Sequence, residues 1–532
     1  MRRSYPVRDY WFLKIPVVLA LLSAAFLIAP LIGMFANLDR ASIASVFAQE
    51  SLGLIVFRTV FSSFLVTVLS VVLAYLLAWC MERTAVRGKK WFRTLVTIPM
   101  LIPSVSIGMG VVLLGGNNGV LTNLLGLHTG SIYGLAGIVW GSVLYAFPVA
   151  FLMIDNVLRL EDSTQYEAAK VLGLSRWKQF WAITVPYLKK PLIVVAFSVF
   201  TLSFTDYGVP LMVGGKYKTL AMVMYQEVIG QLAFGKGCVY GSMLLIPAVI
   251  AFVLDYMNQS NANAAFVTRP FIIRREPLRD TLAAVYAVLA AVSSILPIIA
   301  FILLAFVKKY PSDMTFTLQN VGKTLQMGGG KYLLNSVCIA LLVSVFGVLL
   351  TTVSAYFTAR TKTRFTRVLH LMCMSMAAIP GVVLGLAYVL LFKGTFVYNT
   401  LAILVMVNTV HFFASPYLMM YTSMSKINLN LEGVTSTLGI SRFRLLTAVL
   451  IPQCMHTIRE SFSFFFVNCM MTISAVSFLA NTRTKPVALM INQFEAQAQM
   501  ECAAVVSLAI LLVNVIVKGL LERSGKGKTS AK

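Results

Sequence analysis

The sequence contains twelve apolar stretches that are each long enough to cross a lipid bilayer as a helix. A spanning helix needs about 20 mostly apolar residues, because the hydrocarbon core of a bilayer is about 30 Å thick. The stretches lie near residues 11–36, 55–81, 94–115, 133–158, 191–212, 238–258, 280–307, 334–358, 370–392, 399–423, 460–481 and 502–521. Hydrophobic residues make up 58% of the chain and charged residues only 12%, more apolar surface than a soluble core buries. We therefore expect an all-α, polytopic membrane protein with twelve spans.

The basic residues predict which ends of these spans face the cytoplasm. The chain has 44 Lys and Arg against 19 Asp and Glu, a net charge of +25. With the N-terminus in the cytoplasm, about three quarters of the basic residues fall in cytoplasmic segments, as positive-inside topology requires. An even number of spans then returns the C-terminus to the cytoplasm. The positive charge therefore indicates membrane topology, and we expect no nucleic acid as a partner.

The chain also repeats itself at two constant offsets. The pairs 277 residues apart are Arg83 and Arg360, Pro103 and Pro380, and Gly108 and Gly385; those 266 apart are Gly173 and Gly439, Ser175 and Ser441, Arg176 and Arg442, and Pro186 and Pro452. Each copy holds six of the predicted spans, so both copies enter the membrane the same way up, as parallel repeats do. The sequence thus predicts a first half over 1–262, a cytoplasmic linker over 263–279 and a second half over 280–532.

The cytoplasmic loop between the fourth and fifth spans carries the most specific motif. Glu167 to Leu172 has a helix-forming composition, and Gly173 suits a left-handed helix end. Ser175 can cap a second short helix, which we expect Pro186 to end or kink. The loop is rich in large apolar side chains: Val171, Leu172, Trp177, Phe180 and Trp181. We therefore expect a protruding pair of short helices, called the first knuckle (residues 164–186), with an apolar surface to bury.

Glu167-Ala168-Ala169, then Gly173, then Ile183-x-x-Pro186 resembles the "EAA" signature of the permease subunits of binding-protein-dependent ABC importers. That family prefers Leu before the proline, where this chain has Val185. The resemblance implies a MetI-like, type I importer permease fold. It also implies that the knuckle is a coupling helix seated in a cleft on a separate ATPase. The contact residues implied are Glu167, Ala168, Ala169, Leu172, Gly173 and Pro186.

The resemblance further implies the partners and the setting of the chain. These are two copies of an ABC ATPase at the cytoplasmic face, an extracytoplasmic solute-binding protein, and the bilayer of a bacterial cytoplasmic (inner) membrane. The sequence contains no complete nucleotide-binding motif, so we expect the chain to bind no cofactor and to be no enzyme, with ATP used by the partner. The fused, double-length form resembles the permease branch for ferric iron, 2-aminoethylphosphonate or polyamine-like solutes.

The second copy of the loop departs from the signature. Its coupling positions are Gly433, Val434, Thr435, Leu438, Gly439 and Pro452, and Glu432 falls one residue too early. We call residues 430–452 the second knuckle. Our hypothesis is that the two knuckles are unequal and that Glu167 makes the polar contact with the ATPase.

Polar residues in two equivalent spans are candidates for the substrate pathway. Asp206, in the outer part of the fifth span, is followed by Tyr207 and Gly208, and the eleventh span has Thr472 and Ser474. An acid inside a span is costly and therefore suggests function. The other interpretation is that Asp206 pairs with a basic neighbour or reaches the outer surface. The histidines and cysteines show no ligand spacing, so we expect no metal site.

Two other classes of protein fit a polytopic chain. An ion-coupled secondary transporter with two six-helix halves would need charged residues inside the spans for the coupling ion, and spans 1–4 and 7–10 are poor in them. A membrane enzyme acting on lipid would need clustered His, Asp or Glu near one membrane face, and the sequence shows no such cluster. Neither class explains the loop motif that occurs in both halves.

Overall fold

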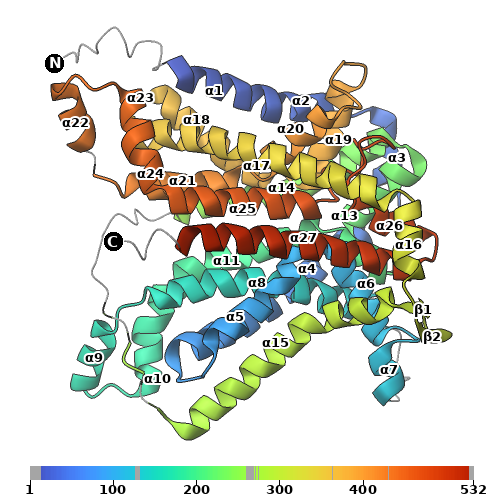
Figure 1. The fold of residues 1–532 in the computed structure, drawn as a ribbon, viewed down its shortest axis with the longest axis horizontal. Helices are drawn as coiled ribbons and strands as arrows, with labels where there is room; N and C mark the ends of the chain where they lie inside the picture. The colour runs from blue at the N-terminus through green and yellow to red at the C-terminus, as the bar shows by residue number, and fades with distance from the viewer. Residues whose placement is uncertain are drawn as a thin grey trace.

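Helices dominate the computed structural model of the protein (Figure 1). The structure describes residues 14–125, 132–258, 269, 271–273, 275–361, 363–428 and 430–526. The helices before the linker are α1 (Ile15–Ser23), α2 (Ala29–Ala36), α3 (Arg40–Phe47), α4 (Leu52–Arg83), α5 (Lys89–Thr97), α6 (Ser104–Gly115), α7 (Val120–Leu125), α8 (Leu135–Arg159), α9 (Thr164–Val171), α10 (Arg176–Gln179), α11 (Val185–Thr205), α12 (Gly208–Val213), α13 (Leu220–Tyr225) and α14 (Phe234–Asn258).

After the linker, one short antiparallel hairpin of strands lies among the helices. Its strands are β1 (Val307–Lys309) and β2 (Asp313–Phe316). The helices are α15 (Pro277–Ala305), α16 (Gln319–Gln326), α17 (Gly329–Arg360), α18 (Arg364–Ser375), α19 (Gly381–Phe392), α20 (Leu401–His411), α21 (Ala414–Ser425), α22 (Asn430–Thr437), α23 (Arg442–Leu445), α24 (Ile451–Gln453), α25 (Met455–Met471), α26 (Leu489–Ala496) and α27 (Met500–Lys526). Residues 263–268, 270 and 274 of the predicted linker lie outside the described residues.

The all-α, multi-pass fold is confirmed, and several of the twelve predicted spans are interrupted. Nine of the described helices are long and apolar enough to cross a membrane, and two bent pairs could each supply one more span. The pairs are α18 with α19, bent by 110°, and α20 with α21, bent by 54°. The eleventh predicted span, 460–481, is only partly helical, because α25 has 17 residues and ends at Met471. Turns follow it to residue 488.

Two more predicted spans are broken near their middle. The span predicted over 94–115 breaks at Ile102 and Pro103, where the backbone is extended between α5 and α6. The span predicted over 191–212 breaks at Asp206, which is extended at the end of α11. The break expected at Pro186 is absent: a π-helical turn over Phe180–Thr184 leads directly into α11, with the proline in its first turn. Proline has no backbone N–H to donate to the preceding turn, and the wider π-helical turn lies immediately before it, as a second one does before Pro452.

The two halves of the sequence form equivalent helices at the predicted offsets. Helices α4 and α17 have 32 residues each and lie 277 positions apart, and α6 and α19 have 12 each at the same offset. The knuckle helices α9 and α22 have eight residues each and lie 266 apart. Figure 1 places the knuckles α9–α10 and α22–α23 at one end of the molecule, with β1, β2 and α7 at the other. The internal repeat is thus a structural repeat with its knuckles on one side.

The first helix of each half packs against the opposite half. Helices α1 and α2 contact α18 and α19, whereas α15 contacts α5, α6 and α27. Polar contacts also join the halves inside the apolar core. Tyr388 donates to the carbonyl oxygen of Phe26 at 2.7 Å, and the hydroxyls of Ser106 and Ser507 lie 2.8 Å apart. The two halves are therefore interlaced, and both contribute to each of the two clusters of buried apolar residues.

Candidate functional site

The first knuckle has the helix-turn-helix form that its sequence predicts. Helix α9 ends in a left-handed residue, Gly173, with φ +74°. The backbone N–H of Leu174 donates to the carbonyl of Ala169 at 3.0 Å, which is the bond that closes a helix end of this kind. The hydroxyl of Ser175 accepts from the backbone N–H of Lys178 and so begins α10. Local capping thus sets the angle between the two helices.

The outer surface of the first knuckle combines large apolar side chains with one acidic group, Glu167, and with basic groups. Val171 is 88% exposed, Leu172 77% and Trp177 69%. Glu167 is exposed, and its carboxylate forms no ion pair or hydrogen bond with any described residue. Ala168, Gly173 and Pro186 are exposed as well, whereas Ala169 is buried against the knuckle's own interior. Exposed apolar patches of this kind mark interaction sites when a carboxylate lies among them.

An internal polar cluster holds the first knuckle against the end of α4. Arg83 forms an ion pair with Glu161, and its guanidinium lies 3.6 Å from the centre of the Phe271 ring. Tyr166 donates to Glu161 and lies within 2.6 Å of the hydroxyl of Thr184. Burial raises the pKa of the Tyr166 phenol, and the bond to Glu161 adds to the shift, so Tyr166 remains a donor at neutral pH. This cluster therefore links α9 to the end of α4.

The second knuckle has the same backbone and a different support. Gly439 is left-handed, with φ +65°, and Ser441 caps α23. Glu432 forms a two-pronged ion pair with Arg360, at 2.5 Å and 2.7 Å, and the Arg360 side chain is only 1% exposed. Glu432 occupies the position equivalent to Tyr166, 266 residues earlier. It is therefore an internal anchor, and it differs from Glu167, whose carboxylate faces outward.

The predicted contact positions of the second knuckle are mostly exposed. Val434 is 51% exposed and Leu438 67%, and Gly433, Gly439 and Pro452 also lie at the surface. Thr435 is half-buried and its hydroxyl donates to the carbonyl of Leu431 at 3.0 Å. The outer face of this knuckle is thus apolar and contains no carboxylate at the position of Glu167.

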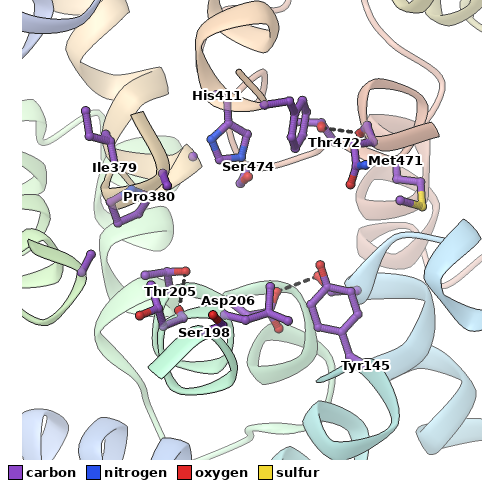
Figure 2. Close-up of a pocket in the computed structure, with 18 of the residues that line it drawn as sticks. Tyr145, Ser198, Thr205, Asp206, Ile379, Pro380, His411, Met471, Thr472 and Ser474 are labelled. Atoms are coloured by element: carbon purple, nitrogen blue, oxygen red, sulfur yellow. Dashed lines mark hydrogen bonds between the residues drawn. The ribbon is translucent and has the colours of Figure 1, made fainter. Parts of the chain in front are cut away.

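The helix breaks of both halves meet at a cavity of about 450 Å³ (Figure 2). Its walls include the break before α6, the break after α11, the bends of α18–α19 and α20–α21, and the end of α25. Substrate sites of membrane transporters are typically formed by such discontinuous helices where two repeats meet. The breaks that the hydropathy pattern missed therefore locate the candidate pathway.

Asp206 lies on the first-half wall of this cavity, at the break between α11 and α12. Its carboxylate accepts from the Ser104 hydroxyl at 2.7 Å and from the backbone N–H groups of Gly208 and Val209 at 3.2 Å and 3.0 Å. These bonds tie the start of α6 to the start of α12. None of the described ion pairs includes Asp206, which also argues against pairing with a basic neighbour.

The other predicted pathway residues have different environments. Tyr207 is buried, stacks on Tyr225 with ring centres 4.4 Å apart and reaches Ser477 of the second half at 3.3 Å. Gly208 has no room for a side chain, since a Cβ there would lie 2.3 Å from the Ser104 hydroxyl. Thr472 and Ser474 line the opposite wall, and the Thr472 hydroxyl donates to the carbonyl of Asn468 at 2.6 Å.

Sequence reasoning missed several residues that line the cavity. Tyr145 and His411 lie on opposite walls. Ser198 and Asn468 also face the cavity. The signal that could have pointed to the first pair is a polar ring inside an apolar predicted span in each half. Among the described residues, no group of three or more His, Cys, Asp or Glu could hold a metal ion.

Comparison with known proteins identifies the class. The family model for the binding-protein-dependent transport system inner membrane component matches residues 70–261 and 347–528. The two matches span more than half of the chain and fall one in each half. The protein therefore belongs to this family of transport permeases, and it is a double-length member.

Individual relatives share the whole length or one half. The chain is 24% identical to the ferric transport system permease protein FbpB of Actinobacillus pleuropneumoniae, over 92% of this chain and 75% of the relative. It is 24% identical to the thiamine transport system permease protein ThiP of Escherichia coli, over 98% of both chains. The molybdenum transport system permease protein ModB of Azotobacter vinelandii is 28% identical over 36% of this chain and 87% of its own length.

Proposed function

We propose that the protein is the transmembrane permease of an ATP-binding-cassette importer and moves a small solute through the cavity between its halves. The observation that carries this proposal is the presence of two equivalent knuckles, with apolar outer faces, at one end of the molecule. Each knuckle continues into a helix that lines the cavity, α11 in the first half and α25 in the second. A displacement of a knuckle is therefore passed through α11 or α25 to the cavity wall.

The partners follow from this arrangement. Each knuckle fits a cleft on one copy of a separate ABC ATPase, in contact with residues Glu167 to Gly173 and Pro186 in the first half and Gly433 to Gly439 and Pro452 in the second. The chain itself binds no nucleotide and catalyses no reaction. A solute-binding protein delivers the solute at the opposite end, beside β1, β2 and α7. The membrane is the bacterial cytoplasmic membrane, with the knuckles and both termini on the cytoplasmic side.

The solute belongs to the small molecules that such permeases carry. The names of the relatives include ferric transport and thiamine transport, and the fused form is also consistent with 2-aminoethylphosphonate or polyamine-like solutes. Asp206, Tyr207, Gly208, Thr472 and Ser474 line or support the cavity that the solute crosses.

Co-purification tests the proposal most directly. The full-length chain, extracted in mild detergent, should retain an ABC ATPase, and the double variant with Glu167→Ala and Leu172→Ala should lose it. The matched control is Gln165→Ala, which alters an exposed residue of α9 outside the proposed contact. Uptake into sealed vesicles should need ATP and survive an ionophore. Uptake that an ionophore abolishes, with no ATPase bound, would instead favour an ion-coupled secondary transporter.

A further inference from the structure

The charges around the cavity are unbalanced. Of the residues that line it, Asp206 is the only one with a carboxyl group, and no lysine or arginine is among them. The titratable groups that face it from the other elements are Tyr145 and Tyr207, which are neutral as phenols, and His411 on the second-half wall. An anion in this cavity would meet a carboxylate without a compensating cation, in surroundings where repulsion is stronger than in water.

Asp206 also retains capacity to bind. A carboxylate has about four acceptor sites, and three are used, by the Ser104 hydroxyl and by the N–H groups of Gly208 and Val209. All three donors are neutral, so its negative charge is not cancelled. Asp206 is partly exposed on the cavity side. At the equivalent place in the second half, Thr472 carries no charge, so the attraction for a cation comes from one wall.

The surroundings of Asp206 fit an organic molecule better than a bare metal ion. A hard trivalent ion requires several oxygen ligands, often from more than one carboxylate, and the described residues supply only Asp206 here. The cavity volume of about 450 Å³ lies in the range of sites for organic ligands. Aromatic side chains, whose ring faces attract cations, line several sides: Tyr145, Phe197, Tyr207, Phe252 and Phe412.

Hydroxyl groups complete this environment. Ser198 and Thr205 lie on the wall of Asp206, and Ser474 lies across from them beside His411 (Figure 2). We propose that the cavity selects an organic cation, a solute with one positive charge directed at Asp206 and hydrogen-bonding groups directed at these hydroxyls. The inference rests on the proposed function, because it assigns the solute class for the same pathway.

Charged thiol reagents of similar size test this selectivity without knowledge of the solute. Ser198 is an exposed side chain on the cavity wall, so Ser198→Cys places a reporter there. Cys338, the exposed native cysteine among those described, is replaced by serine in the same full-length chain. Membranes containing this variant are treated with a trimethylammonium, a sulfonate and a neutral methanethiosulfonate. The neutral reagent measures access, and the ratio of the other two rates, corrected for intrinsic reactivity, measures charge preference.

We expect the cationic reagent to react about tenfold faster than the anionic one, and Asp206→Asn to reduce the ratio to nearly one while the neutral rate stays the same. Equal rates with Asp206 present would overturn the organic-cation assignment and leave the pathway intact. If the neutral reagent does not reach the thiol introduced by Ser198→Cys even during ATP turnover, the pathway in the proposed function fails as well.

A second measurement separates an organic cation from a metal ion. Terbium(III), a hard trivalent ion whose luminescence is excited through nearby tyrosines, is added to the unmodified chain and to the Asp206→Asn variant. Tyr145 and Tyr207 line the same cavity as Asp206. We expect no luminescence that depends on Asp206. A signal that Asp206→Asn abolishes would show a metal site and overturn the proposal.

Discussion

The two knuckles have the same backbone but are attached to the protein in different ways. In the first, Arg83 pairs with Glu161, Tyr166 also binds Glu161, and Glu167 remains free of described partners at the surface. In the second, one residue, Glu432, pairs with the buried Arg360. In the first knuckle, Glu161 anchors the loop and a different carboxylate, Glu167, is exposed. In the second knuckle, the carboxylate of Glu432 serves as the anchor. The following variants test that difference, from the largest expected effect to the smallest.

Arg360→Ala should have the largest effect. Arg360 also donates to the carbonyls of Ile427 and Asn428 at 2.5 Å and 2.9 Å, so its loss leaves Glu432 and this turn without partners. We expect the free energy of unfolding to fall by about 3 kcal/mol, measured as a lower melting temperature in detergent. Arg444→Ala, at an exposed position of the same knuckle, should change it by less than about 0.5 kcal/mol. Similar losses from both variants would refute the anchoring role.

Substitutions at the equivalent positions Tyr166 and Glu432 should lower the free energy of unfolding by different amounts. Tyr166→Phe removes hydrogen bonds to Glu161 and Thr184 but leaves the Arg83–Glu161 pair, so we expect a loss of about 1 kcal/mol. Glu432→Gln leaves the buried Arg360 without a negative charge, so we expect about 2 kcal/mol or more. Thermal unfolding of both variants in the same detergent gives the comparison. A larger loss for Tyr166→Phe would contradict the assignment of supports.

Glu167→Ala should affect association and not stability. An exposed carboxylate without a described partner contributes less than about 0.5 kcal/mol to folding. Its loss from a contact with the ATPase should reduce ATPase recovery, and with it transport, about tenfold. ATPase recovered per amount of folded chain is the measurement. Glu432→Gln, normalised in the same way, should recover nearly as much ATPase as the unmodified chain. Equal normalised losses would end the hypothesis of unequal knuckles.

Gly433→Glu should have the smallest effect and make the knuckles more alike. Gly433 is equivalent to Glu167, is exposed, and has no atom within 4 Å of the place where a Cβ would lie. Replacing this helical glycine should stabilise α22 by up to about 1 kcal/mol. We expect ATPase recovery to rise about twofold over Gly433→Ala, which adds the helix propensity without the charge. Equal recovery from the two variants would show that the second cleft does not use a carboxylate.

The repeat and the local capping could be predicted from the sequence. The constant offsets between proline, glycine and arginine residues predicted equivalent helices in the two halves, and α4 and α17 are indeed equal in length. The left-handed Gly173 was expected because glycine tolerates that backbone and helices often end with it, and Gly439 has the same conformation. The capping depends on residues that are close together in the chain, so a short window of sequence contains the information.

The anchors could not be predicted from the sequence, and hydropathy alone did not locate the breaks. Hydropathy reports whether a stretch is apolar and long, and the interrupted stretches around Pro103, Asp206 and Pro380 satisfy both conditions. The role of Glu432 depends on Arg360, which lies 72 residues earlier. Spacing from the signature alone made Glu432 resemble a displaced Glu167. The contact with Arg360 determines the role of Glu432, and a single sequence does not show contacts between distant segments.

The exchange of first helices between the halves has a consequence for biosynthesis. Helix α15 covers a surface of α5 and α6. That surface is not covered by α15 until the ribosome has added all residues from the end of α6 to the end of α15. The partners of α1, namely α18 and its neighbours, emerge later still. Neither repeat therefore completes its packing without the other. Helix α1 has no partner to pack against until translation has reached the second copy.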